Sequence, residues 1–253
     1  MATTRQRILI TGASSGLGAE MARQLAAKGR DLALCARRTD KLEALREEIL
    51  AATPQARVLV RAMDVTDDAQ VFEVTRAFAA DLGGLDRVVV NAGLGKGAAL
   101  GTGRHDVNRE TAVTNFLGAL AQTEAAMEVF RAQGHGHLVM VSSMSAMRGL
   151  PRSMTTYAAT KAAVAHLVEG LRLELLGEPY AFTVLYPGYI ASEMNDATDS
   201  ARKPGLVSTE KGVHAMVEAM EKEKAEACVP PLPWAPLSVV MRHAPLPVLK
   251  RMV

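Results

Sequence analysis

The sequence is poor in cysteine: Cys35 and Cys228 are the only two among 253 residues. Disulfide-stabilised secreted domains are much richer in cysteine, and these two residues have neither the spacing nor the neighbours of a zinc site. The cysteine content therefore argues against a disulfide scaffold and a cysteine-based metal site. We expect a protein of the reducing cytoplasm.

An excess of charge of one sign and long apolar runs are also missing. The 29 Lys and Arg residues nearly balance the 27 Asp and Glu residues, which gives no electrostatic indication of nucleic-acid binding. The apolar run Ile8 to Ile10 is too short for a signal-peptide core or a membrane-spanning helix. Since 49% of the residues are apolar, and neither repeats nor low-complexity linkers occur, we predict one soluble globular domain.

Short runs of branched apolar residues alternate with longer helical patterns, as is typical of a parallel sheet with helices on both faces. The predicted strands are 7–11, 31–36, 57–65, 87–92, 137–143 and 181–188. The predicted helices are 15–28, 40–51, 67–81, 107–131, 157–176 and 208–224. This order predicts an α/β fold, a single Rossmann-like doubly wound parallel sheet, over residues 1–229.

Residues 230–253 differ from the rest because they are apolar and rich in proline, and they contain the only tryptophan, Trp234. Their length and proline content exclude a membrane-spanning helix. We predict a tail that packs on the domain or on a neighbouring subunit. Contact with a membrane surface or with an apolar substrate is the alternative interpretation.

A glycine-rich turn, with Gly12, Gly16 and Gly18 in the spacing G-x-x-x-G-x-G, joins the first predicted strand to the first helix. Glycine permits a tight turn and lets the backbone and the helix N-terminus approach a pyrophosphate closely. The same turn also serves ordinary strand-to-helix connections, so alone it indicates a dinucleotide site only weakly.

Two arginines, Arg37 and Arg38, follow the second predicted strand, where an NAD enzyme usually presents an acid to the ribose. A guanidinium attracts a 2′-phosphate that a carboxylate would repel, so this position favours NADP(H) over NAD(H). The alternative is a pair of arginines on a solvated loop.

The ends of the third and fourth predicted strands also carry candidate cofactor contacts. Asp64 and Val65 are placed to meet an adenine, and Asn91, Ala92 and Gly93 are suited to lie along the cofactor. Each group, taken singly, also fits an ordinary Asx turn between a strand and a loop.

Tyr157 and Lys161 lie four residues apart, so on a helix they project side by side. An ammonium about 4 to 5 Å from a phenol supplies roughly 3 to 4 kcal/mol at an effective dielectric constant near 20, which would lower the phenol pKa by about two to three units. The phenol would then serve as an acid or base near neutral pH. A core tyrosine beside a snorkelling lysine is the alternative, and the pattern is common by chance.

Serines lie just before this helix: Ser142, Ser143 and Ser145 follow the fifth predicted strand, at the sheet edge where ligands of parallel sheets bind. The joint pattern resembles the short-chain dehydrogenase/reductase family over about residues 5 to 229. The motifs that carry the resemblance are T-G-x-x-x-G-x-G at 11–18, N-A-G at 91–93, serine before Y-x-x-x-K at 157–161, and YPGYIAS at 186–192.

The resemblance implies a role for four catalytic residues. Tyr157 would be the general acid in carbonyl reduction, and Lys161 would lower its pKa and hold the nicotinamide ribose. Ser143 would bind the substrate oxygen, and Asn115 would support a water relay to the lysine. The interval from Ser143 to Tyr157 is one residue longer than usual in the family, within "PRSMTT", so Ser142 and Ser145 remain alternatives to Ser143.

The resemblance also implies the cofactor-binding residues. They are Gly12, Ser14, Ser15, Gly16, Leu17, Gly18, Arg37, Arg38, Asp64, Val65, Asn91, Ala92, Gly93, Tyr157, Lys161, Pro187, Gly188, Ile190 and Ser192. We predict no metal, because His135 and His137 have no nearby cysteine or carboxylate in the sequence.

These features predict a cytoplasmic NADP(H)-dependent oxidoreductase that interconverts a ketone or aldehyde and an alcohol, with a small and fairly apolar substrate. The resemblance implies a homodimer or homotetramer. Two other functions remain open: a catalytically weak dinucleotide-binding regulator, and an epimerase or dehydratase that uses the same tyrosine and lysine.

Overall fold

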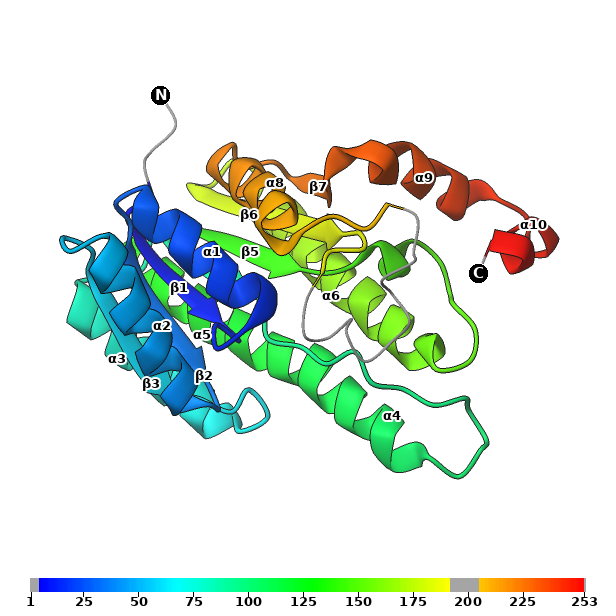
Figure 1. Cartoon of the computed structure of the whole chain (residues 1–253), viewed down its shortest axis with the longest axis horizontal. Coiled ribbons are helices and arrows are strands. Elements are labelled where there is room, and N and C mark those ends of the chain that lie inside the picture. The colour runs from blue at the N-terminus through cyan, green and yellow to red at the C-terminus, as the bar shows by residue number, and fades with distance from the viewer. Residues whose placement is uncertain (1–4, 192–204, 253) are drawn as a thin grey trace.

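The computed structural model describes residues 5–191 and 205–252, and it contains one parallel seven-stranded sheet (Figure 1). The strand order is β3-β2-β1-β4-β5-β6-β7. The strands are β1 (Arg7–Thr11), β2 (Asp31–Ala36), β3 (Val58–Ala62), β4 (Arg87–Val90), β5 (Gly136–Val141), β6 (Tyr180–Pro187) and β7 (Glu226–Val229). The order reverses between β1 and β4, and ligands of such sheets bind at the carboxyl ends of the strands beside this reversal.

Helices cover both faces of the sheet, so the predicted doubly wound Rossmann-like fold is confirmed (Figure 1). The helices are α1 (Gly16–Ala27), α2 (Thr39–Ala52), α3 (Asp68–Leu82), α4 (His105–Ala112), α5 (Gly118–Gln133), α6 (Met154–Glu174), α8 (Thr209–Glu221), α9 (Pro231–His243) and α10 (Leu246–Met252). A π-helical segment, η1 (Val113–Leu117), joins α4 to α5, and a 3-10 turn, η2 (Met144–Met147), follows β5. Within the described residues, no helix has the length and apolarity needed to cross a membrane.

The central strands are nearly continuous apolar runs because both of their faces are buried. In β1, Leu9 packs in a core formed with α3, α5 and α6. Its neighbours Ile8 and Ile10 point to the other face and pack in a core formed with α1, α2 and α8. The two cores hold the sheet rigidly, and the loops at the carboxyl ends of its strands form the candidate site.

The structure differs from the predicted elements in the third strand and in the fourth predicted helix. The strand predicted over 57–65 ends at Ala62, because the Asp64 carboxylate turns back to accept hydrogen bonds from the backbone and hydroxyl of Thr66. The helix predicted over 107–131 starts at His105 and is interrupted by the π segment η1. Such π segments insert one extra residue per turn and are frequent at functional sites.

The segment after β7, predicted as an apolar tail, forms two helices. Proline is tolerated at a helix start, where its missing N–H has no intrahelical partner. Pro231 lies at the start of α9, and Leu232 has a non-helical backbone, so Pro236 follows only four residues after this kink. The side chains of Trp234 and Met241 are buried in the core that contains α3, α5 and α6.

Candidate active site

The glycine turn between β1 and α1 brings three chain segments into close contact. Gly12 and Gly16 have positive φ angles of 63° and 55°, which disfavour any other residue. A Cβ on Gly12 would lie 2.8 Å from the Cα of Ala92, and a Cβ on Gly18 would collide with the Gly12 carbonyl oxygen. Ser15, the N-cap residue of α1, makes no side-chain hydrogen bond to the helix backbone, so the N–H groups of the first turn are not capped by it.

Arg38 reaches from the end of β2 to this turn. Its Nε donates to the Ser14 hydroxyl at 3.2 Å, and its Nη2 donates to the hydroxyls of Ser14 and Ser15 at 3.1 and 2.6 Å. Both Arg37 and Arg38 are exposed. The structure thus brings Arg38, from the loop between β2 and α2, to the turn that the sequence predicts as the pyrophosphate site.

Asp64 and Val65 stand at the end of β3. Burial opposes ionisation of the Asp64 carboxyl, but hydrogen bonds from Thr66 and the charge of Arg37 prevail and hold its pKa below the usual range. Val65 is buried, and a Cβ added to Gly118 would lie 2.6 Å from the Val65 carbonyl oxygen. Asp64 is therefore ionised beside the Arg37 loop, while Val65 packs against the start of α5.

Thr11 links the glycine turn to the loop after β4. Its hydroxyl accepts hydrogen bonds from the backbone N–H groups of Asn91 and Ala92 at 3.0 and 3.1 Å. In return, the side-chain amide of Asn91 donates to the Thr11 carbonyl at 2.8 Å. Sequence reasoning did not single out Thr11 as a functional residue, although it is the threonine of the T-G-x-x-x-G-x-G motif.

Asn115 lies in η1, where it is 1% exposed. Its Oδ1 accepts from the Leu94 N–H at 2.7 Å, and its Nδ2 donates to the Leu94 carbonyl at 2.8 Å. A Cβ on Gly93 would lie 3.2 Å from Asn115 Oδ1 and 3.4 Å from Lys161 Nζ. The missing side chain at Gly93 therefore lets the asparagine and the lysine meet the loop after β4.

On α6, Lys161 is buried and Tyr157 is half-buried, and the Lys161 Nζ lies 5.9 Å from the centre of the Tyr157 ring. The ammonium donates to the Val141 carbonyl at 2.8 Å. Burial lowers the pKa of Lys161 to about 8. Burial also raises the pKa of Tyr157, although a hydrogen bond with Ser143 opposes the change.

The sequence predicts a net lowering of the Tyr157 pKa by Lys161, whereas in this structure burial dominates and the pKa is raised. The ammonium is directed at the end of β5 rather than at the phenolic oxygen, and removal of the phenol from water favours its neutral form. A protonated phenol is the form that a general acid requires.

The three candidate serines have different environments. Ser142 is buried and donates to the Lys161 carbonyl at 2.7 Å, so it ties β5 to α6. Ser143 caps η2, and its hydroxyl lowers the pKa of the Tyr157 phenol, in opposition to burial. The hydroxyl of Ser145 is buried and has no hydrogen-bond partner within the described part of the chain. Among the three serines, Ser143 is the one that acts on the Tyr157 phenol.

The segment before Tyr157, where the family resemblance implies one extra residue, forms a tight turn. Arg152 has a positive φ of 60°, and Thr155 N–H donates to its carbonyl at 3.3 Å. The neighbouring Ser153 carbonyl packs so closely on Gly97 that a Cβ at position 97 would collide with it. This turn therefore packs against the loop after β4.

The segment after β6 packs against α9 and α8. The Trp234 indole lies on Gly188, where it leaves no space for a Cβ, and its ring meets Tyr189 edge-on at 5.3 Å. The side chain of Ile190 packs against Gly212 of α8. Pro187 ends β6, and the predicted Ser192 lies outside the described residues. Trp234 is a second residue that sequence reasoning missed, because its contact with Gly188 spans more than forty residues.

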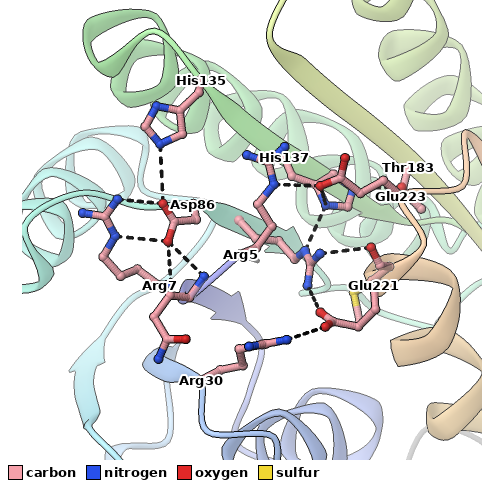
Figure 2. A network of polar contacts seen from close by, with 12 residues as sticks. Arg5, Arg7, Arg30, Asp86, His135, His137, Thr183, Glu221 and Glu223 are labelled. Atoms are coloured by element: carbon pink, nitrogen blue, oxygen red, sulfur yellow. Dashed lines mark hydrogen bonds and ion pairs between the residues drawn. The ribbon is translucent and has the colours of Figure 1, made fainter. Parts of the chain in front are cut away.

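His135 and His137, weighed as metal ligands, lie at the opposite edge of the sheet (Figure 2). His137 is fully buried between Arg87 and Thr183, and His135 lies 3.5 Å from the Asp86 carboxylate. Across residues 5–191 and 205–252, no group of three or more His, Cys, Asp or Glu side chains is arranged to hold a metal ion.

The glycine turn, the serine before Y-x-x-x-K and the parallel sheet define one architecture, and comparison with known proteins identifies it. Residues 6–203 match the model of the family described as short chain dehydrogenase. The chain belongs to the short-chain dehydrogenase family. The predicted resemblance is thus confirmed, and the protein is an oxidoreductase of this family with a nucleotide-binding Rossmann fold.

Relatives of the short-chain dehydrogenase family match almost the entire chain. An uncharacterized oxidoreductase of Mycobacterium tuberculosis is 48% identical over 248 residues, 98% of this chain and 97% of the relative. The crystal structure of levodione reductase is 25% identical with a TM-score of 0.82, over 94% of this chain and 99% of that one. An alcohol dehydrogenase of Thermococcus sibiricus complexed with 5-hydroxy-NADP is 28% identical with a TM-score of 0.77, over 88% and 95% of the two chains.

Proposed function

We propose that this short-chain dehydrogenase uses NADP(H) to interconvert a ketone or aldehyde and an alcohol, with Tyr157 as the general acid and base. The observation that carries the proposal is the half-buried Tyr157, whose pKa is influenced by the nearby Ser143 hydroxyl, one helical turn from the buried Lys161. Asn115 and Lys161 both approach Gly93, at the carboxyl ends of the strands where the fold binds its ligands.

The residues of the glycine turn fit a dinucleotide. Gly12 and Gly18 leave no room for side chains, and the first turn of α1 has no side-chain cap, as a pyrophosphate site requires. Arg37 and Arg38 would hold the 2′-phosphate, because guanidinium groups pair with phosphate in charge-assisted hydrogen bonds. The 5-hydroxy-NADP complex of the Thermococcus sibiricus relative supports this choice of cofactor. When bound, the cofactor supplies hydride transfer to or from the substrate carbon.

Proton transfer falls to residues of the chain. Ser143 would hold the substrate oxygen beside Tyr157, and the phenol would donate its proton as negative charge develops on that oxygen. The raised pKa of Tyr157 keeps the phenol protonated before the reaction. Below its pKa of about 8, the Lys161 ammonium would then stabilise the phenolate through space. Asn115 would support return of a proton through the lysine.

Some further predictions belong to the same proposal. An apolar substrate is supported by Met144 and Met147, which form η2 directly after Ser143, and by Trp234 on Gly188. A homodimer or homotetramer is supported by the exposed Leu173 and Leu176 at the end of the long helix α6. The cytoplasmic location and the boundary between the domain (1–229) and the C-terminal segment (230–253) remain predictions.

A labelled cofactor tests the reaction directly. The protein is mixed with NADPH deuterated at C4 and with a panel of steroid, retinoid, acyl and sugar ketones, and the products are analysed by mass spectrometry. We expect an alcohol that carries one deuterium, formed more efficiently from NADPH than from NADH. Cofactor binding without deuterium transfer to any carbonyl would favour a regulator instead, and a substrate isomerised without net oxidation would favour an epimerase.

A further inference from the structure

Helix α9 has apolar side chains on both its buried and its exposed side. Trp234, Ser238 and Met241, spaced at helical intervals, form its buried side. On the opposite side, Val239 is 58% exposed and Val240 is 48% exposed. A surface helix of a globular protein normally presents polar residues there, so an apolar outer side indicates a further contact.

The apolar exposure continues into α10. The described residues include eleven exposed large hydrophobic side chains, and five of them belong to the segment 231–251, which we call the α9–α10 segment. These five are Leu232, Val239, Val240, Leu246 and Val248. The segment is less than a tenth of the chain, so this concentration distinguishes it from scattered surface leucines.

The charges of the α9–α10 segment all have one sign. It contains Arg242, Lys250 and Arg251 and no Asp or Glu. Within the described residues, Arg242 reaches Glu226 at 3.6 Å, whereas Lys250 and Arg251 are exposed and form no ion pair. Arg148 adds a further positive charge, because its Nη1 donates to the Arg242 carbonyl at 3.1 Å.

This combination fits an anionic bilayer better than a second copy of the chain. A twofold contact through the α9–α10 segment would bring the cationic side chains of two copies close together with no carboxylate of the segment between them, which is unfavourable. At a bilayer, apolar side chains enter the boundary between headgroups and acyl chains, while Lys and Arg bind anionic headgroups. Figure 1 shows α9 and α10 at one end of the molecule, beyond β7, where a flat surface can reach them.

We propose that the α9–α10 segment docks on the surface of an anionic lipid bilayer. The same two helices supply the apolar side chains that enter the bilayer and the cations that bind the headgroups. Full affinity requires both kinds of contact. The inference is independent of the proposed catalytic function, because it rests on exposed side chains outside the catalytic set.

Vesicle binding by the full chain tests the proposal. Co-sedimentation uses vesicles of equal parts phosphatidylcholine and phosphatidylglycerol, with pure phosphatidylcholine vesicles in parallel. We expect binding to the anionic vesicles that weakens as salt rises, and little binding to the neutral ones. Equal binding to both compositions, or no binding to either, would overturn the proposal without the need for any variant.

A charge variant locates the contact. Lys250→Gln with Arg251→Gln should weaken binding to anionic vesicles about 30-fold, since each residue near the surface contributes about one kcal/mol. The matched control, Lys211→Gln with Lys224→Gln, also removes two exposed positive charges and should bind as the wild type does. Equal losses in the two variants would show that only net charge matters and would contradict the assigned surface.

An apolar variant tests the insertion. Val239→Ser with Val240→Ser should reduce vesicle binding by a factor of about ten or more, because the two exposed valine side chains no longer enter the lipid bilayer surface. In the matched control, Leu173→Ser with Leu176→Ser removes two exposed leucines, one in the last turn of α6 and one just after that helix, and vesicle binding should stay unchanged. If instead light scattering shows that the Val239 and Val240 variant dissociates an oligomer and vesicle binding is unaltered, a second copy covers this surface and the proposal is wrong.

Discussion

The two ends of the sheet both bury charged or titratable side chains, but they treat them differently. At the amino end, Arg87 donates to His137 Nδ1 at 2.9 Å, to Glu221 at 2.5 Å and to the Met220 carbonyl at 3.0 Å (Figure 2). At the carboxyl end, Lys161 is buried with a hydrogen bond to the Val141 carbonyl. Arg87 and Lys161 are both buried, but only Arg87 has a carboxylate partner. The Lys161 ammonium has a neutral carbonyl instead.

The pKa values follow from this difference. Burial lowers the pKa of Arg87, but the contact with Glu221 opposes the change. Burial and the neighbouring arginines lower the pKa of His137 well below its ordinary value, so its neutral ring accepts from Arg87 and donates to Thr183 at 2.8 Å. Lys161 has no comparable compensation, and its pKa falls to about 8. The groups of the Arg87 network keep one protonation state near neutral pH, whereas Lys161 can gain or lose a proton there.

Arg87→Met should show the largest effect on stability. The substitution leaves the buried His137 and the Glu221 carboxylate without their shared donor, and breaking a buried pair in this way costs about 3 to 5 kcal/mol. Urea unfolding measures the loss. Arg76→Met is the matched control, because it breaks the exposed ion pair with Glu128 and should change stability little. Equal effects of the two variants would remove the distinction between network and surface pair.

Comparison of the wild type with Lys161→Met should show how the buried lysine makes the free energy of unfolding depend on pH. The pKa of Lys161 is about 8 in the folded protein and an ordinary 10.5 in the unfolded chain. Below pH 8 both states carry the proton, and burial of the charge costs about 3 kcal/mol. Above pH 8 the unfolded chain binds more protons, so the contribution of this lysine to stability improves as the pH rises towards 10.5.

The free energy of unfolding of the wild type relative to Lys161→Met should therefore rise by about 2 to 3 kcal/mol between pH 7 and pH 10. Urea titrations of both proteins at each pH measure it, and the difference cancels other titrating groups common to both. A difference that stays constant with pH would show that the lysine is not desolvated.

Arg37→Ala with Arg38→Ala tests the two exposed arginines after β2, at the carboxyl ends of the strands. We expect NADPH binding to weaken by roughly 1.5 to 3 kcal/mol, the contribution of hydrogen bonds to a charged group, with NADH binding much less affected. Cofactor fluorescence titration gives both dissociation constants. An unchanged ratio would remove the argument from the 2′-phosphate.

Alanine substitutions of Ser142, Ser143 and Ser145 should distinguish a serine that stabilises the fold from one that binds the substrate. Their effects on stability should be smaller than that of Arg87→Met. Ser142→Ala loses a buried hydrogen bond and should cost about 1 kcal/mol of stability. Ser145→Ala removes a buried hydroxyl without a partner in the described residues, so stability should stay equal or rise. Ser143→Ala should reduce kcat/KM with little loss of stability. A drop in kcat/KM confined to Ser145→Ala would transfer the role in substrate binding to that serine.

Much of the fold was predictable because strand periodicity and glycine punctuation are local signals. The doubly wound sheet and the family were confirmed. The structure brings Ser143 near Tyr157 and Lys161 because hydrogen bonds of Ser142 and Lys161 hold α6 against the end of β5. The direction of the Lys161 ammonium was not predictable, since it depends on the Val141 carbonyl of another element.

Other features arise from contacts between distant parts of the chain. Arg87 meets residues 50 and 134 positions away, and no periodic pattern indicates such a network. The metal interpretation of His137 was weighed without knowledge of Arg87 as its neighbour. The helices α9 and α10 were missed because the proline-rich segment was interpreted as an apolar tail, whereas burial of Trp234 against Gly188 stabilises α9.

The most direct test of the catalytic assignment is Tyr157→Phe, measured for NADPH consumption with a carbonyl substrate that the wild type reduces. We predict that carbonyl reduction falls by a factor of about 10² to 10⁴ while NADPH binding and the free energy of unfolding stay close to those of the wild type. Turnover equal to that of the wild type would contradict the assignment of Tyr157 as the proton donor.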